Sequence, residues 1–273
     1  MIRLVGAALL LLASAAPTAG QPLIAAHRGG AGLWPENSLL AFRNALVLGV
    51  DFLETDVHLT ADDEVVVLHD PTLDRTTTAT GPVVARRLSE LATARLRAAD
   101  GAPTEEPIPT LAQLLDLLAS PPPRGVEPAR LLLEIKVDAA RNRYQGIEEK
   151  VLALIRSRRL GARVLVMAFE PETLRRVRSL DAAVPTVLLV SRARMEREGA
   201  AAVVREARDV GASHLGIDHR TIESATVAAA RAAGLRLAAW TVNAESDLRR
   251  VFGLGVDIVI TDRPDLAARL VRR

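Results

Sequence analysis

The chain has 273 residues, of which 49% are hydrophobic and 25% are charged, and its formal net charge is +2. This composition is ordinary for a globular protein with a large core. Arginine is spread along the chain without long basic runs, which argues against a nucleic-acid-binding surface. The absence of cysteine excludes a disulfide scaffold.

Residues 1–20 have the pattern of a secretory signal peptide. Arg3 precedes an apolar run from Leu4 to Ala16, and small residues follow through Gly20. The run is shorter than the roughly 20 apolar residues that a membrane-spanning helix needs, so no membrane span is predicted. We therefore predict a cleaved signal at 1–20, a periplasmic or secreted protein, and a single domain over 21–273.

Eight buried strands alternate with helices along the chain. The strands are expected to begin near residues 22, 51, 131, 162, 184, 213, 235 and 256, and helices are expected up to Leu48 and over 111–119, 145–160, 172–180, 194–210, 222–233, 244–252 and 264–271. Continuous Val, Ile and Leu runs between helices indicate a parallel sheet. Eight units in one domain favour an α/β fold of the (β/α)8 TIM-barrel type. A doubly wound open sheet is the alternative, because the period alone does not establish closure.

Residues 71–109 interrupt this rhythm, since they are rich in Pro, Thr and Gly. A helical turn over 88–96 is the one regular element expected there. The segment is predicted to be a surface excursion of the same domain.

Three carboxylates are expected at neighbouring strand ends. Glu54 and Asp56 are two residues apart on one strand and therefore share a face. Two like charges in an apolar wall are costly unless a cation lies between them. Glu134 ends another strand, so the three acids form an all-oxygen set suited to Mg²⁺ or Ca²⁺. The alternative is a structural charge network in which these acids pair with Arg28 and Lys136.

Two histidines end apolar runs near these acids. A metal beside Arg28 and Lys136 would attract a phosphoryl group, and His27 and His69 could then act as general base and general acid. His58 is expected to be solvated beyond the end of its strand.

Several separated motifs occur in the order typical of one enzyme family. They are HRGGAGLWPENS, E-T-D, VVLHDPTLDRTT, IPTL, LEIK, WTVN and TDRP, and they run from His27 to Pro264. In this the chain resembles the glycerophosphodiester phosphodiesterase family. The resemblance implies a metal-dependent barrel enzyme that cleaves a small-molecule glycerophosphodiester to sn-glycerol 3-phosphate and an alcohol.

The resemblance also implies residue roles. His27 and His69 match the family's acid–base pair, Glu54, Asp56 and Glu134 match its metal ligands, Arg28 and Lys136 match its phosphate contacts, and Trp240 matches a wall of the substrate pocket. Two other functions remain open on the sequence: a phospholipase of the same barrel type that leaves a cyclic phosphate, and a periplasmic protein that binds glycerophosphodiesters without cleaving them. The short segment between Lys136 and the next helix predicts an open mouth to the site.

Overall fold

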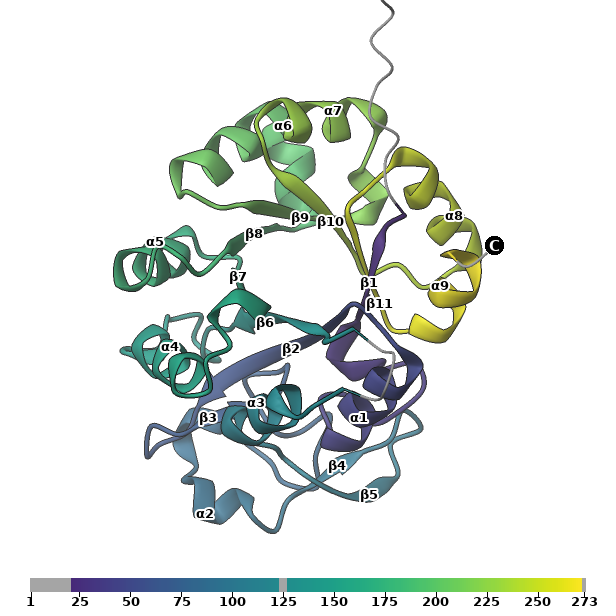
Figure 1. Cartoon of the computed structure of the whole chain (residues 1–273). Helices are drawn as coiled ribbons and strands as arrows, with labels where there is room; N and C mark the ends of the chain where they lie inside the picture. Colours follow the sequence, from purple (N-terminus) through teal and green to yellow (C-terminus); the bar gives the residue numbers. More distant parts are fainter. Residues whose placement is uncertain (1–20, 123–126, 272–273) are drawn as a thin grey trace, which may run out of the picture.

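The computed structural model describes residues 21–122 and 127–271, so the predicted signal peptide at 1–20 lies outside the described residues. Eight parallel strands lie at the centre, with helices around them (Figure 1). The strands are β1 (Leu23–Ala26), β2 (Phe52–Leu59), β6 (Arg130–Ile135), β7 (Val164–Ala168), β8 (Thr186–Val190), β9 (His214–Asp218), β10 (Arg236–Trp240) and β11 (Ile258–Thr261). Each begins within two residues of the predicted start.

The sheet closes on itself through β1. Ala25 lies opposite Phe52 of β2, and Leu23 lies opposite Ile258 of β11, with both pairings parallel. A strand that is paired on both sides leaves no open edge between the first and last repeats. Closure confirms the predicted (β/α)8 barrel and excludes the doubly wound open sheet.

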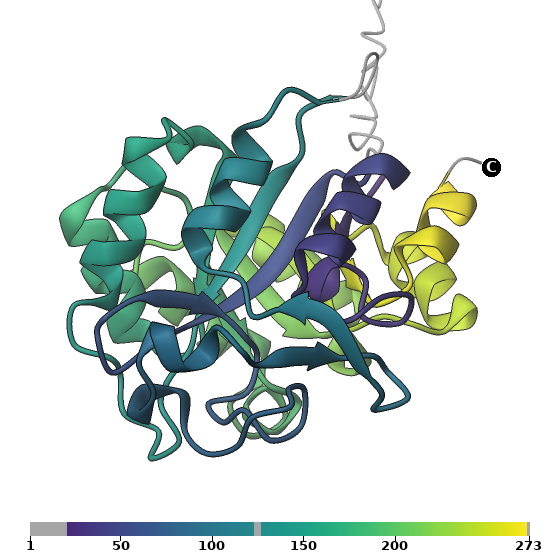
Figure 2. The same ribbon diagram turned by 90° about the horizontal axis from the view of Figure 1, so that it is seen from below.

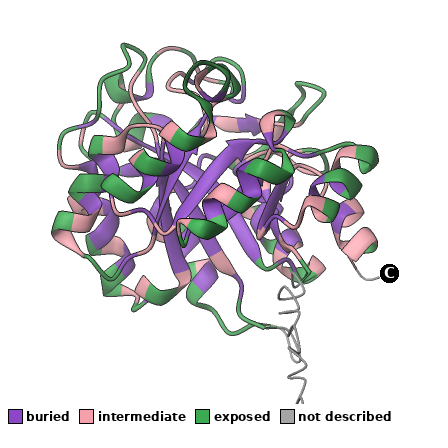
Figure 3. Ribbon diagram, turned by 90° about the horizontal axis from the view of Figure 1, so that it is seen from above, coloured by how far each residue is buried: buried purple, intermediate pink, exposed green. Residues whose placement is uncertain are grey.

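Helices cover the outside of the barrel. They are α1 (Leu39–Leu48), α3 (Leu111–Ala119), α4 (Ile147–Ser157), α5 (Pro171–Leu180), α6 (Arg192–Asp209), α7 (Ser224–Ala232), α8 (Glu245–Leu254) and α9 (Pro264–Val271). In α1, the Ser38 hydroxyl accepts a hydrogen bond from the Ala41 N–H, and Gly49 at φ 78° ends the helix. Figure 3 shows buried strands and helices whose outer faces are exposed. None of the helices in the described parts of the chain is long and apolar enough to cross a membrane.

The excursion after β2 forms a small lobe beside the barrel (Figure 2). β3 (Val65–Val67) pairs antiparallel with the end of β2, α2 covers Leu88–Leu91, and β4 (Arg95–Arg97) pairs antiparallel with β5 (Pro103–Pro107). The expected helical turn over 88–96 is therefore shorter than predicted. The lobe has its own apolar cluster, made by Val66, Leu68, Leu73, Val83, Leu91, Ala94, Leu96 and Ile108. That cluster fixes the segment which carries His69.

The barrel interior is filled by side chains and is not a pore. The inward-facing cluster consists of Ala25, Phe52, Leu132, Leu165, Met167, Val187, Leu189, Ala238, Ile258 and Ile260. Three of these residues, Met167, Leu189 and Ile260, also line a cavity at the carboxyl ends of the strands. The top of the core is thus the floor of the candidate site, which is where barrel enzymes place their chemistry.

Candidate active site

His27 begins a short 3₁₀ turn, η1 (His27–Gly29), directly after β1. Its Nδ1 lies 2.6 Å from Oδ1 of Asp262, which follows β11, and its Nε2 lies 3.9 Å from Glu54. Burial alone would raise the pKa of Asp262, but hydrogen bonds with His27 and Asn243 lower it below the ordinary value. Because Asp262 is therefore a carboxylate, it favours a proton on Nδ1 and leaves Nε2 free for chemistry.

The backbone of Arg28 is left-handed, with φ 51°. This geometry directs its N–H to Oε2 of Glu54 at 2.8 Å, while its guanidinium donates to Glu36 at 3.0 Å and lies 3.7 Å from Asp56. Burial lowers the pKa of Arg28, but Asp56, Glu36 and Glu54 together raise it above the usual value. Arg28 is thus a fixed positive charge at the rim of the acids.

The three predicted acids meet at one point. In the register of β2 and β6, Asp56 lies opposite Glu134, and one oxygen from each of Glu54, Asp56 and Glu134 lies within 4.8 Å of the others. The residues are only 2%, 1% and 7% exposed. Burial, and then the charge of Asp56, raise the pKa of Glu54 well above its usual value. Burial likewise raises the pKa of Glu134 to about 7, in spite of Lys136.

Asp56 behaves in the opposite way to its neighbours. Burial would raise its pKa, but the positive charges of Lys136, His69 and Arg28 lower it far below the ordinary value. Lys136 Nζ lies 2.9 Å from Glu134 and 3.4 Å from Oδ1 of Asp56. The predicted ion pairs with the two cations therefore do form.

These ion pairs do not satisfy the whole acidic set. Asp56 Oδ1 is buried and has no hydrogen-bond partner among the described residues, while Oδ2 accepts from the Asn37 side chain at 3.0 Å. Lys136 Nζ, at 3.4 Å, forms an ion pair with Oδ1 but no hydrogen bond, and a buried carboxylate oxygen that accepts no hydrogen bond is costly. Three carboxylates converging in this way supply the hard oxygen ligands that Mg²⁺ or Ca²⁺ prefers, so the residues present fit a divalent cation.

His69 reaches the same end of the barrel from the segment after β3. Its Nδ1 lies 2.7 Å from Oδ1 of Asp70. Burial lowers the pKa of His69, and Asp56 opposes that effect. Two histidines, each paired through Nδ1 with an aspartate, thus flank the acids.

The prediction for His58 is wrong. Its side chain is fully buried, with Nδ1 2.8 Å from the Tyr144 hydroxyl and Nε2 3.1 Å from the carbonyl oxygen of His69. The reason is that β2 continues to Leu59 and β3 pairs with this extension, so the strand does not end before His58. Burial lowers the pKa of His58 to about 4, and the neutral ring supports the backbone of His69.

Arg75 joins the two halves of the site, although no pattern in the sequence distinguishes it from the other arginines. It donates to both oxygens of Glu36 at 2.8 and 2.9 Å, and to both oxygens of Asp70 at 2.6 and 2.9 Å. Glu36 in turn accepts from Arg28, and Asp70 contacts His69. Arg75 belongs to the motif VVLHDPTLDRTT that contains His69. The spacing of that motif does not show that Arg75 binds Glu36 and Asp70.

A cavity of about 100 Å³ lies among these groups. It is lined by His27, Arg28, Glu54, His69, Glu134, Lys136, Met167, Phe169, Leu189, Trp240, Thr241 and Ile260. Trp240 is part of this lining, and its ring contacts that of Phe169 edge-on, with centroids 5.7 Å apart. Asp56 is the predicted site residue absent from the lining, because it lies beneath Arg28 and Lys136.

A larger hollow of about 700 Å³, which we call the outer groove, adjoins the cavity. It is lined by His69, Pro71, Glu134, Lys136, Val137, Asp138, Ala139, Arg141, Phe169, Glu170 and Ser191. His69, Glu134, Lys136 and Phe169 line both spaces. The segment between β6 and α4 lines this groove with Val137, Asp138, Ala139 and Arg141.

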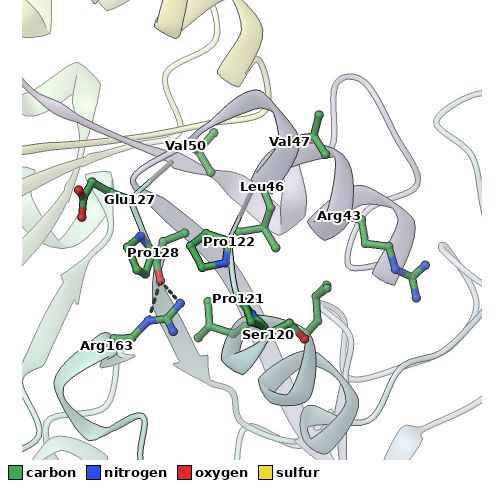
Figure 4. Close-up of a pocket in the computed structure, with 13 residues that line it drawn as sticks. Arg43, Leu46, Val47, Val50, Ser120, Pro121, Pro122, Glu127, Pro128 and Arg163 are labelled. Carbon is green, nitrogen blue, oxygen red and sulfur yellow. Dashed lines mark hydrogen bonds between the residues drawn. The ribbon is translucent and has the colours of Figure 1, made fainter. Parts of the chain in front are cut away.

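A separate apolar cavity of about 290 Å³ lies at the opposite end of the barrel (Figure 4). Its wall includes Leu46, Val50 and Pro128, together with Arg163, which donates to the Ala129 carbonyl oxygen. None of the converging acids or histidines lies there. The polar cavity is therefore the candidate active site.

The fold and this site define a barrel enzyme, with acids, imidazoles and cations gathered at the carboxyl ends of the strands. Residues 27–266 match the sequence profile of the Glycerophosphoryl diester phosphodiesterase family. The chain belongs to this family.

Individual relatives agree with the family match. The chain is 32% identical over 252 residues to a glycerophosphodiester phosphodiesterase of Caldanaerobacter subterraneus subsp. tengcongensis, covering 92% of this chain and 98% of the relative. A crystal structure from Agrobacterium tumefaciens, provisionally named a glycerophosphoryl diester phosphodiesterase, has a TM-score of 0.84 at 28% identity, over 93% of this chain and 98% of that one. An Oleispira antarctica phosphodiesterase, solved with the product sn-glycerol-3-phosphate, has a TM-score of 0.73 at 25% identity, over 93% of this chain and 98% of that one.

Proposed function

We propose that this enzyme hydrolyses glycerophosphodiesters to sn-glycerol 3-phosphate and an alcohol, with a divalent metal ion and two histidines. The observation that carries the proposal is the convergence of Glu54, Asp56 and Glu134 within 4.8 Å of one another, beside a cavity that His27 and His69 also line. Family membership and the product bound by the Oleispira antarctica relative support the substrate class.

Glu54, Asp56 and Glu134 would hold Mg²⁺ or Ca²⁺. Such an ion, when bound, supplies positive charge that stabilises the negative charge developing on phosphate oxygens. Arg28 and Lys136 line the same cavity and would bind the phosphate group directly. Trp240 would exclude water from one side of the substrate and position its glycerol or alcohol part.

His27 would act as the general base. Its Nε2 is left free to accept a proton because Asp262 contacts Nδ1. The proton comes from the nucleophile, which is either water or the neighbouring glycerol hydroxyl. The new oxygen–phosphorus bond then forms as the bond to the alcohol breaks. When the hydroxyl attacks, a cyclic phosphate forms first, and water must then open it to give sn-glycerol 3-phosphate.

His69 would protonate the departing alcohol. It lines both the inner cavity and the outer groove, so it lies between the phosphate site and the space available for the alcohol. A bound phosphodiester anion favours the protonated imidazole, and Asp70 stabilises that form from the other side. A positioned acid or base of this kind contributes about 10²- to 10⁴-fold in rate.

Phosphorus NMR of glycerophosphocholine tests this function. With added Mg²⁺ or Ca²⁺, the diester signal should be replaced by that of glycerol 3-phosphate, and a chelator should stop the conversion. An unchanged diester signal with metal present would instead support a binding protein. Accumulation of a cyclic phosphate would support the phospholipase-like route. Full turnover by His69→Ala would remove that residue from the mechanism.

We also propose that the protein acts in the periplasm or outside the cell. The support is the charged, apolar and small-residue pattern of residues 1–20. The amino-terminal sequence of the protein recovered from the periplasm or culture medium tests it. A protein that remains in the cytoplasm with these residues attached would contradict the proposal.

A further inference from the structure

The outer groove is where the substrate's alcohol would lie, if the phosphate occupies the inner cavity as the proposed function requires. The two spaces share His69, Glu134, Lys136 and Phe169. A phosphodiester has two ester arms, and the inner cavity of about 100 Å³ is too small to hold both together with the phosphate. The charges along the groove therefore bear on which alcohols the enzyme accepts.

Lys136 does not set the charge of the groove. It lies 2.9 Å from Glu134 and 3.4 Å from Asp56, so its positive charge is directed inward to the acids. The charged groups that remain along the groove are Asp138, Glu170 and Arg141. Apart from the groups already paired, the groove is therefore lined by two carboxylates and one guanidinium.

Of the two carboxylates, Glu170 is the one whose side chain has no partner among the described residues. It precedes α5, and its backbone carbonyl oxygen accepts from the Thr173 N–H at 3.1 Å. Its side chain does not cap that helix and forms no hydrogen bond or ion pair with any residue the structure describes. Asp138, in contrast, accepts hydrogen bonds from the backbone and side chain of Asn142, which order its own loop. Glu170 is therefore free to pair with a ligand.

Next to Glu170 is an aromatic ring at the entrance to the inner cavity. Phe169 lines both spaces, and the edge-on contact with Trp240 fixes its orientation. An aromatic ring beside a carboxylate is a combination that recognises ammonium groups. The inner cavity is rich in positive charge, whereas the groove beyond it carries an excess of carboxylate.

We propose that Glu170 makes the outer groove select glycerophosphodiesters whose alcohol carries a positive charge, such as ethanolamine or choline. In these substrates the ammonium group is two carbons beyond the ester oxygen, so the molecule is negative at phosphorus and positive just outside it. That order of charges matches the order from the inner cavity to the groove. The inference rests on the proposed function and names its substrate class.

The test compares substrates on the metal-loaded enzyme. We measure kcat/KM for glycerophosphoethanolamine, glycerophosphocholine and the neutral glycerophosphoglycerol, with the neutral compound as the internal reference. The wild type should prefer both cationic substrates to the neutral one. Glu170→Gln, which removes the charge at constant shape, should reduce that preference about five-fold, as expected for a partly exposed ion pair of about 1 kcal/mol.

Two variants serve as controls. Glu172→Gln makes the same change two residues further on, at an exposed carboxylate that pairs with Arg175 outside the groove, and should leave the preference unchanged. Arg141→Gln removes the opposing charge and should increase the preference. The ring of Phe169 favours the larger, less hydrated ammonium, so the choline substrate should be preferred to the ethanolamine substrate.

The outcomes separate the two claims. If no glycerophosphodiester is hydrolysed, the proposed function fails, and the inference fails with it. If all are hydrolysed but Glu170→Gln retains the wild-type preference, or the wild type favours the neutral compound, the inference alone is overturned.

Discussion

The imidazole of His27 and the carboxylate of Asp262 lie 2.6 Å apart, although 235 residues separate them in the sequence. Barrel closure produces this contact, because β1 and β11 pair in parallel and both residues follow the ends of those strands. Asn243 holds the other oxygen of Asp262 at 2.6 Å. The proposed base is thus oriented by the last repeat of the fold.

Asp262→Asn should lower kcat for glycerophosphocholine by roughly 10²-fold, because an amide no longer favours the required tautomer and orientation of His27. Substrate binding should change little, since Asp262 does not line the cavity. Steady-state kinetics check both expectations. Asp265→Asn is the matched control, because that carboxylate pairs with Arg263 away from the site. Unaltered kcat in Asp262→Asn would show that the contact does not serve catalysis.

Arg75→Lys should lower kcat/KM about ten-fold. A lysine retains the charge, but one ammonium group cannot donate to both oxygens of Glu36 and both oxygens of Asp70. Glu36 contacts Arg28 and Asp70 contacts His69. Without the bridge between these two carboxylates, Arg28 and His69 are held less firmly relative to each other. Because the Arg75 side chain is 48% exposed, the free energy of unfolding should fall by only about 1 kcal/mol or less.

Arg95→Lys is the control for this effect, since Arg95 is in the same lobe and donates to backbone carbonyl oxygens of residues 92 and 94. Kinetics and thermal unfolding of the two variants distinguish positioning from general stability. A loss of activity that is matched by a large loss of stability would contradict the positioning role.

Much of the barrel was predictable, because each repeat is a local pattern. A short apolar run is visible in the sequence, and β6 is predicted from such a run, with three leucines in a row. The i, i+2 spacing of Glu54 and Asp56 also predicted a shared face. Their meeting with Glu134 depends on β2 pairing with β6, which in turn requires that residues 71–109 stay outside the barrel.

The supporting contacts were less predictable, because they join segments without a repeating pattern. β5 has alternating exposure but contains two prolines and two glutamates, so it resembles a loop in sequence. The burial of His58 depends on Tyr144, which is 86 residues away. Arg75 is one arginine among many, and only the folded lobe brings it to two carboxylates.

His214 gives the protein a pH-dependent stability that is independent of catalysis. It begins β9 at the end of the barrel opposite the site and is 7% exposed. Burial, and then the charge of Arg236, lower its pKa to about 4. The unfolded chain binds a proton near pH 6.5 and the folded chain does not, so stability falls as pH decreases from about 6.5 to 4.

Between pH 7.5 and 4.5 this group should account for about 2 kcal/mol of the loss in the free energy of unfolding. Denaturant unfolding of the wild type and His214→Gln at both pH values measures it. The variant should be less pH-sensitive by that amount, while other acidic transitions affect both proteins equally. Equal pH sensitivity of the two proteins would show that the folded His214 titrates normally.

Divalent metal should stabilise the protein through Glu54, Asp56 and Glu134. At a free ion concentration about 100 times Kd, the gain in the free energy of unfolding is about 2.7 kcal/mol, or roughly 5 to 10 °C in Tm for a chain of this size. Asp56→Asn removes the carboxylate whose Oδ1 accepts no hydrogen bond among the described residues, and it should abolish both this shift and turnover. Asp63→Asn, at an exposed turn with φ 64° that asparagine also adopts, should retain both. Thermal scans of each variant with Mg²⁺, with Ca²⁺ and with chelator make the comparison, and a full metal-induced shift in Asp56→Asn would place the ion elsewhere.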